Sequence, residues 1–228
     1  VVYTSLAGLT EDVSIDGGAG SNTLVFDTPG ESGAWDNESY GAVTFDLSTD
    51  LGNATNFVNV GGGSGADTLT GNASANVIIG AGGGDTLYGG AGNDTLYGDE
   101  HAGDTSGTTY GIRQYGLTDG ADTLYGGAGD DTLYASDGDD TLDGGTGTDT
   151  LTGGSGSDTF IIRAGDGTDT ITDFGDNGDV IGLIGLSYND LTLEADGQNT
   201  RVKYGVDSLV VLLNVLPGEL SESDFNTL

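Results

Sequence analysis

Carboxylates recur at a fixed interval along two stretches of the chain. Every ninth residue there is Asp, or once Asn: Asp67, Asn76, Asp85 and Asp94, then Asp122, Asp131, Asp140, Asp149 and Asp158. The chain has one His and no Cys, so it offers little of what zinc or copper prefers. Oxygen donors in such number suit calcium, which accepts about six to eight of them in flexible geometry. The residue types and their spacing therefore predict calcium binding.

Each nine-residue unit divides into a Gly-rich turn and a short strand. The turn is a hexad such as 126–131, where Gly accepts positive φ without steric cost. An apolar side chain follows two residues after each repeat position: Leu69, Ile78, Leu87, Leu96, Leu124, Leu133, Leu142, Leu151 and Phe160. Because strand neighbours point to opposite faces, these side chains face inward, and the flanking Thr and Tyr face outward.

Two units make a coil of eighteen residues with strands on two opposing walls. The pattern predicts an all-β fold, a right-handed parallel β-solenoid (β-roll) with a thin apolar core. Residues eighteen apart then stack, which pairs Asp67 with Asp85, Asp122 with Asp140, and Asp131 with Asp149. Carboxylates about 4.8 Å apart repel one another, and a divalent cation between them reverses the sign of the interaction.

The unit Gly-Gly-x-Gly-x-Asp-x-apolar-x resembles the calcium-binding nonapeptide repeat of the RTX (repeats-in-toxin) family. The resemblance is strong over 61–182, moderate from there to the C-terminus and weak over 1–60. It implies a domain order of ion-poor solenoid coils at 1–60, a calcium-binding β-roll at 61–182 with an irregular loop at about 105–121, and a C-terminal region at 183–228. That last region is expected to form an antiparallel β cap and to carry a type I secretion signal.

The resemblance also implies a ligand set. In this family one turn gives the carbonyl oxygens of its second and fourth positions and its Asp, and the facing turn gives the carbonyls of its first and third positions and its Asp. The sets carried over are Gly63, Gly65, Asp67 with Gly80, Gly82, Asp85; Gly127, Gly129, Asp131 with Gly144, Thr146, Asp149; and Ser136, Gly138, Asp140 with Gly153, Ser155, Asp158. Gly120, Asp137, Gly147 and Gly156 join the ligands on the same pattern.

Less regular pairs extend this scheme to about seven calcium ions. They are Asp85 with Asp104, Asp104 with Asp122, Asp149 with Asp169, and Asp158 with Asp179. Asn76 stands opposite Asp94 and should weaken the site there, because an amide carries no charge.

Composition excludes several classes of function. The net charge is −33, with 4 Lys and Arg against 37 Asp and Glu, which disfavours nucleic acid and anionic lipid as partners. No apolar run approaches the roughly 20 residues of a membrane span. His101 is the only His, so the repeats cannot assemble a Ser-His-Asp group, and we expect no enzyme activity here. The chain opens Val1-Val2 without Met, so we expect a piece of a longer protein whose catalysis, if any, lies in a missing N-terminal part.

The leading hypothesis is a calcium-dependent folding module of a large secreted bacterial protein, such as an adhesin, toxin or exoenzyme. The resemblance implies the type I secretion machinery as a partner and an extracellular or cell-surface location. An alternative is a polysaccharide-binding module like those attached to alginate epimerases, which would need exposed cations from Arg113, Arg163, Arg201 and Lys203. A third is an ice- or surface-binding solenoid built on outward Thr. Tyr88, Tyr97, Tyr125 and Tyr134 fit either strand propensity or sugar stacking, and the sequence leaves that choice open.

Overall fold

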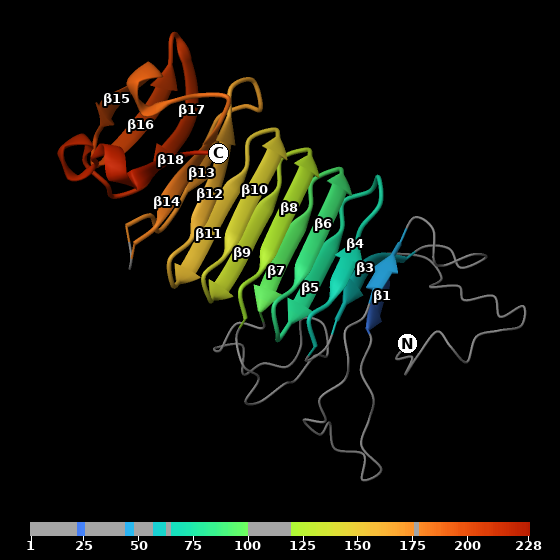
Figure 1. Cartoon of the computed structure of the whole chain (residues 1–228). Helices are drawn as coiled ribbons and strands as arrows, with labels where there is room; N and C mark the ends of the chain where they lie inside the picture. The colour runs from blue at the N-terminus through green and yellow to red at the C-terminus, as the bar shows by residue number, and fades with distance from the viewer. Residues whose placement is uncertain (1–21, 26–43, 48–56, 63–64, 100–119, 176–177) are drawn as a thin grey trace, which may run out of the picture.

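The computed structural model describes residues 22–25, 44–47, 57–62, 65–99, 120–175 and 178–228. These residues form a two-walled parallel solenoid with a small antiparallel cap at its C-terminal end (Figure 1). The described residues contain no α-helix, and none of their helical turns is long or apolar enough to cross a membrane. The predicted fold class is confirmed.

The first wall is a ten-stranded sheet. In spatial order its strands are β1 (Asn22–Val25), β3 (Phe57–Gly61), β5 (Val77–Ala81), β7 (Thr95–Asp99), β9 (Thr132–Asp137), β11 (Thr150–Ser155), β13 (Asp169–Ile171), β17 (Asp207–Leu212), β16 (Asn199–Tyr204) and β15 (Leu191–Asp196). The strands from β1 to β17 pair in parallel, whereas β15, β16 and β17 are antiparallel.

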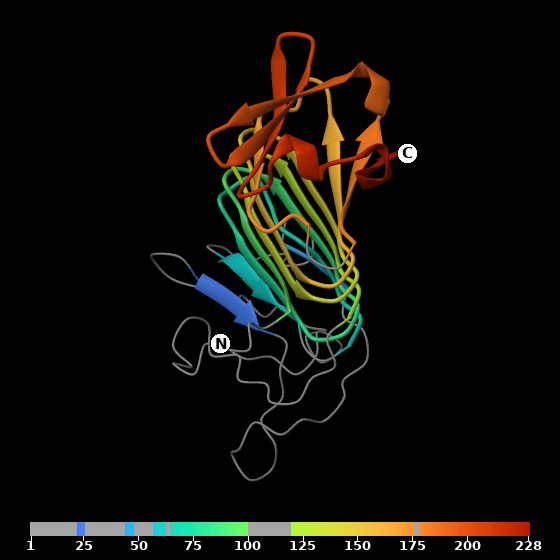
Figure 2. The same cartoon turned by 90° about the vertical axis from the view of Figure 1, so that its left-hand side faces the viewer.

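The second wall is an eight-stranded parallel sheet. Its strands are β2 (Thr44–Asp46), β4 (Thr68–Thr70), β6 (Thr86–Ala91), β8 (Thr123–Ala128), β10 (Thr141–Thr146), β12 (Thr159–Arg163), β14 (Val180–Ile184) and β18 (Phe225–Thr227). Figure 2 shows the two walls on either side of a narrow interior, joined by tight turns. The regular coils repeat every eighteen residues, since Leu69 pairs with Leu87 and Leu124 with Leu142.

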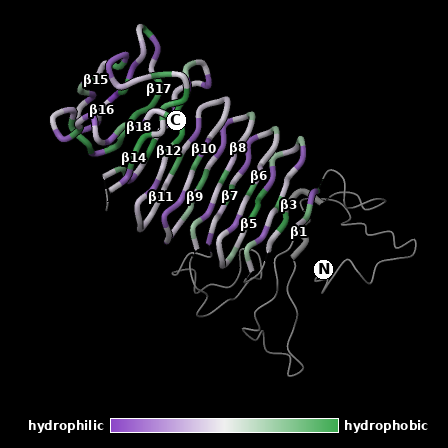
Figure 3. Tube along the Cα trace, viewed as in Figure 1, coloured by the Kyte–Doolittle hydropathy of each residue, from purple (hydrophilic) through white to green (hydrophobic). Residues whose placement is uncertain are grey.

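The core is a ladder of single apolar side chains that the two walls contribute in turn. Leu69, Leu87 and Leu124 from one wall, and Ile78 and Leu96 from the other, are completely buried. Figure 3 shows one hydrophobic segment in each strand and polar or neutral turns between them. One buried side chain per unit is a small apolar contribution, so the turns must supply much of the remaining stability.

Thr and Tyr lie on the outer faces, as predicted. Tyr88 stacks on Tyr125 with ring centroids 4.9 Å apart, and Tyr97 stacks on Tyr134 at 5.2 Å. Both pairs join the coil that ends at Asp99 to the coil that begins at Gly120. Each ring therefore gives one face to its partner.

The coil register corrects the expected loop. Thr86 pairs directly with Thr123, and Thr95 pairs with Thr132, so the coil that ends at Asp99 and the coil that begins at Gly120 are direct neighbours. The expected order Asp85–Asp104–Asp122 and the loop bounds of about 105–121 are wrong, because Gly120 already lies in the turn. Asp104 itself is outside the described residues.

The two ends depart from the regular coil. Near the N-terminus Thr44 pairs with Thr68, which follows it by 24 residues, whereas the regular spacing is eighteen. The strand expected around Val13–Ile15, and Trp35, lie outside the described residues. At the other end the antiparallel strands β15, β16 and β17 form the expected cap; η2 (Tyr188–Asp190) precedes β15, and η3 (Pro217–Glu219) and η4 (Glu222–Asp224) lie between β17 and β18.

Candidate metal sites

The repeat carboxylates form two columns, one along each row of turns. The first Asp column consists of Asp67, Asp85, Asp122, Asp140, Asp158 and Asp179, and the second Asp column of Asn76, Asp94, Asp131, Asp149 and Asp169. Within each column the backbone N–H of one residue donates to Oδ1 of the next, at 2.7–3.1 Å. The predicted neighbours Asp67–Asp85, Asp122–Asp140 and Asp131–Asp149 are therefore in contact.

The second oxygen of each carboxylate, Oδ2, points into the turn. Oδ2 is buried and accepts no hydrogen bond in six of these residues: Asp85, Asp94, Asp131, Asp140, Asp149 and Asp158. A buried carboxylate oxygen without a partner is costly, and a native structure normally satisfies it. This repeated orphan marks a place for a positively charged group in each turn.

The first residue of each hexad must be small because Oδ2 points at it. A Cβ on Gly126 would lie 2.5 Å from Oδ2 of Asp131, and one on Gly153 would lie 2.2 Å from Oδ2 of Asp158. Real Cβ atoms do not approach oxygen so closely, so the carboxylate and the turn backbone share one tight space.

Backbone carbonyls complete this space from both sides. The oxygens of Gly127 and Gly129 face the following turn, since Cβ atoms on Gly145 and Gly147 would lie 2.1 Å and 1.7 Å from them. The oxygen of Thr146 faces back and accepts from the N–H of Gly129 at 2.9 Å. The structure thus brings together residues of the set predicted around Asp131 and Asp149. Positive φ at Gly127 and Gly129 allows this path.

The neighbouring turns repeat the arrangement. The oxygens of Ser136 and Gly138 face Gly154 and Gly156 in the same way, and Ser155 accepts from the N–H of Gly138 at 2.9 Å. The oxygen of Gly65 faces Gly83. Gly63 lies outside the described residues. That these atoms bind calcium remains a prediction.

Burial makes the columns unfavourable without a cation. It raises the pKa of Asp85 to about 9, helped by the charges of Asp122, Asp67 and Asp99. Burial likewise raises the pKa of Asp140, Asp158 and Asp169 to about 7, and those of Asp94 and Asp131 to about 6. A bound cation would keep these groups ionised. The donors are all oxygen and mostly carbonyl, which fits calcium, and among the described residues no His, Cys, Asp or Glu side chains gather as a cluster of three.

Sequence reasoning missed one regular pair, Asp94 with Asp131. The N–H of Asp94 donates to Oδ1 of Asp131 at 2.7 Å, and Cβ atoms on Gly127 and Gly129 would lie 2.1 Å and 1.8 Å from the oxygens of Gly90 and Gly92. The interruption at 100–119 hid this register. The intact hexad 89–94 could have revealed this pair, because a regular hexad stacks on another regular hexad.

At two positions of the columns, the side-chain oxygen accepts a hydrogen bond from a nearby backbone N–H. Oδ1 of Asn76 accepts from the N–H of Asn72 at 2.7 Å. Oδ2 of Asp179 accepts from the N–H of Gly175 at 2.9 Å. In the two sites expected here, Asn76–Asp94 and Asp158–Asp179, only the partner residue has an orphaned oxygen.

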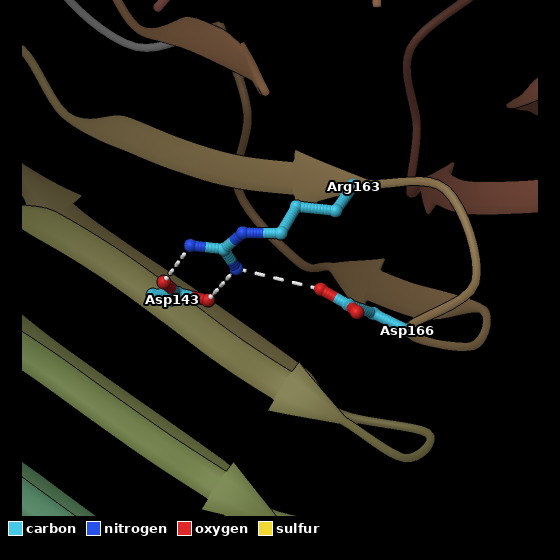
Figure 4. A network of polar contacts seen from close by, with 3 residues as sticks. All are labelled: Asp143, Arg163 and Asp166. Atoms are coloured by element: carbon cyan, nitrogen blue, oxygen red, sulfur yellow. Dashed lines mark hydrogen bonds and ion pairs between the residues drawn. The ribbon is translucent and has the colours of Figure 1, made fainter. Parts of the chain in front are cut away.

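The cations of the described residues are already paired. Arg163 makes a two-pronged ion pair with Asp143, at 2.7 Å and 2.6 Å, and reaches Asp166 at 3.4 Å (Figure 4). Arg201 pairs with Asp196, and Lys203 with Glu194. Arg113 lies outside the described residues. These pairs give little support to a surface for anionic polysaccharide.

Comparison with known proteins agrees with this geometry. A family model described as RTX calcium-binding nonapeptide repeat (4 copies) matches residues 5–28, 61–96, 118–151, 134–171 and 143–181, which together make more than half of the chain. No curated protein sequence matches.

Two solved structures are similar. The extracellular lipase LipA from Serratia marcescens is 18% identical with a TM-score of 0.39, over 79% of this chain and 41% of the lipase. The AlgE6R2 subunit of the mannuronan C5-epimerase from Azotobacter vinelandii is 30% identical with a TM-score of 0.35, over 47% of this chain and 88% of that subunit.

Proposed function

Since the chain belongs to the RTX calcium-binding nonapeptide repeat family, we propose that it is a module that folds when calcium fills its turns. The observation that carries this proposal is the row of buried Oδ2 atoms without hydrogen-bond partners; those of Asp85, Asp94 and Asp131 lie beside a carbonyl oxygen of the next turn. Calcium would cancel the repulsion along both Asp columns and bind only to the folded state. Its binding free energy would then stabilise the fold.

The expected ion positions lie between successive members of the two columns. The orphaned oxygens support positions at Asp67–Asp85, Asp85–Asp122, Asp122–Asp140, Asp140–Asp158, Asp94–Asp131, Asp131–Asp149 and Asp149–Asp169. This set keeps the predicted total of about seven ions, although two of its members differ from the pairs first expected.

A calcium requirement suits a protein exported through a narrow channel. Extracellular calcium modules bind with dissociation constants of roughly 10⁻⁴–10⁻³ M. With that affinity the repeats stay unfolded in a low-calcium cytosol and fold after export. We therefore propose type I secretion and an extracellular location for a longer parent protein, in which this module performs no catalysis.

Circular dichroism of the full chain during a calcium titration tests the proposal. We expect an unfolded spectrum in excess chelator and a cooperative change to a β-rich spectrum as calcium is added. A β-rich spectrum that persists in chelator would refute calcium-dependent folding. Equal action of magnesium at the same concentration would refute the choice of ion, because magnesium demands a smaller octahedral site.

A further inference from the structure

Asp99 places a carboxylate where the other turns have a small, uncharged residue. It occupies the second position of the turn that ends at Asp122, in register with Ala81 one coil earlier. The second positions of the turns closed by the six orphaned carboxylates hold Ala81, Gly90, Gly127, Ser136, Gly145 and Gly154. A bulky acidic residue at this point is therefore a specific feature of this one turn.

The backbone fixes Asp99 between two members of the first Asp column. Gly98, directly before it, sends its carbonyl oxygen to 2.5 Å from the Cβ position of Gly80, where Oδ2 of Asp85 also lies. A Cβ on Gly98 itself would lie 2.1 Å from Oδ2 of Asp122. Asp99 follows at once in the chain and is 1% exposed, so its charge is held inside the turn.

The negative charge is concentrated here. Oδ2 of Asp85 is buried and without a hydrogen-bond partner, and it opens into the space beside Gly98. Asp99 lies close enough to Asp85 for the two carboxylates to repel each other, in addition to the repulsion from Asp122 and Asp67. Further acids also act on a regular position such as Asp140, but these acids, Asp137 and Asp139, are exposed, whereas Asp99 is buried.

We propose that Asp99 makes the ion position between Asp85 and Asp122 the tightest calcium site of the solenoid, by adding a third carboxylate charge beside the pair. The inference rests on the proposed calcium binding. Because the described residues contain no convergent group of three acidic side chains, Asp99 acts through its charge at short range. A negative charge close to a bound divalent cation stabilises that cation by Coulomb attraction even when it does not coordinate it. Calcium would then first fix the register of the two coils that residues 100–119 separate.

Calorimetric calcium titration of the full chain, with a competing chelator to resolve tight binding, tests this. Asp99→Asn keeps the shape and removes the charge, and we expect the dissociation constant of the tightest ion to rise about tenfold with no loss of other ions. Asp207→Asn, an exposed acid in the cap, is the matched control and should bind as the wild type does. An unchanged tightest site in Asp99→Asn would overturn the inference.

A second variant, which adds a charge, tests the inference even if Asp99→Asn does not fold. Ser136→Asp introduces a carboxylate at the equivalent position of the next turn, beside Asp122 and Asp140. We expect a second tight ion in this variant, and titration curves identical to the wild type would overturn the inference. If the wild type binds no calcium at all, the proposed function fails instead, so the two failures are distinguishable.

Discussion

The backbone N–H of Asp94 donates to Oδ1 of Asp131 at 2.7 Å, although 37 residues separate them in the chain. The same separation joins Asp85 to Asp122. Elsewhere in the regular repeats the corresponding bond spans 18 residues. The solenoid is thus continuous across residues 100–119, and the second Asp column has no gap at that point.

Replacing residues 100–119 with a single Gly should leave calcium-dependent folding intact. The flanking coils already pair through β6–β8 and β7–β9 and through both tyrosine stacks. Circular dichroism and the thermal midpoint in saturating calcium provide the measurement. A deletion variant that no longer folds in calcium would show that the segment is part of the solenoid.

Single carboxylates should differ in how many ions they hold. Asp140 is bonded to both Asp122 and Asp158, whereas Asp67, which donates to Asp85, is the first member of the first Asp column. We expect Asp140→Ala to lose two ions and Asp67→Ala to lose one, as counted by calorimetry. Equal losses in the two variants would contradict the stacked geometry.

Acid should stabilise the calcium-free fold. Burial raises the pKa of Asp140, Asp158 and Asp169 to about 7, above their value in the unfolded chain, so between about pH 4 and pH 7 the folded state binds more protons. The free energy of unfolding without calcium therefore falls as pH rises through this window. We expect β structure to increase when the chelated chain is brought from pH 8 to pH 5, and a decrease would contradict the burial of these groups.

A methyl group at Gly153 should disturb the turn that ends at Asp158, although the turn that ends at Asp140 has Ala135 at the same position. Gly153→Ala places Cβ 2.2 Å from Oδ2 of Asp158, so the carboxylate must move, at a cost of about 1–3 kcal/mol in calcium-bound stability. Gly218→Ala, which meets nothing within 4 Å, is the control. Denaturant unfolding in calcium measures both, and equal midpoints would argue against the close contact.

Arg163 should stabilise the calcium-bound fold independently of the ion positions. Arg163→Met keeps much of the stem but leaves Asp143, which is buried, without its guanidinium, at an expected cost of about 1–3 kcal/mol in the free energy of unfolding. Arg201→Met breaks a more exposed pair and should cost less than about 1 kcal/mol. Equal effects would show that the Asp143 pair contributes no more than a surface ion pair.

Most of the fold could be predicted from the repeat. The alternation of one inward Leu with outward Thr and Tyr determines both walls, and the eighteen-residue coil determines which Asp residues stack. The register after Asp94 could not be predicted, because Asp104 follows it by ten residues and so resembled the next repeat. Whether a segment joins the stack depends on the pairing of β6 with β8, which is a tertiary contact.

Local pattern also could not reveal Asp99 or the orphaned oxygens. Tyr97-Gly98-Asp99 differs from the regular Tyr-Gly-Gly by a single residue, and its burial depends on the coils above and below. The directions of the carbonyls of Gly127 and Gly129 likewise depend on their positive φ in the folded turn.

Hydrogen exchange at the Asp backbone amides tests the central claim most directly. In each column the N–H of one Asp is held by the carboxylate of the next, as for Asp85 with Asp122 and Asp131 with Asp149. If calcium holds the columns together, these amides exchange slowly in calcium and at the rate of an unfolded chain in excess chelator. Equal, strong protection of these amides with and without calcium would contradict the account.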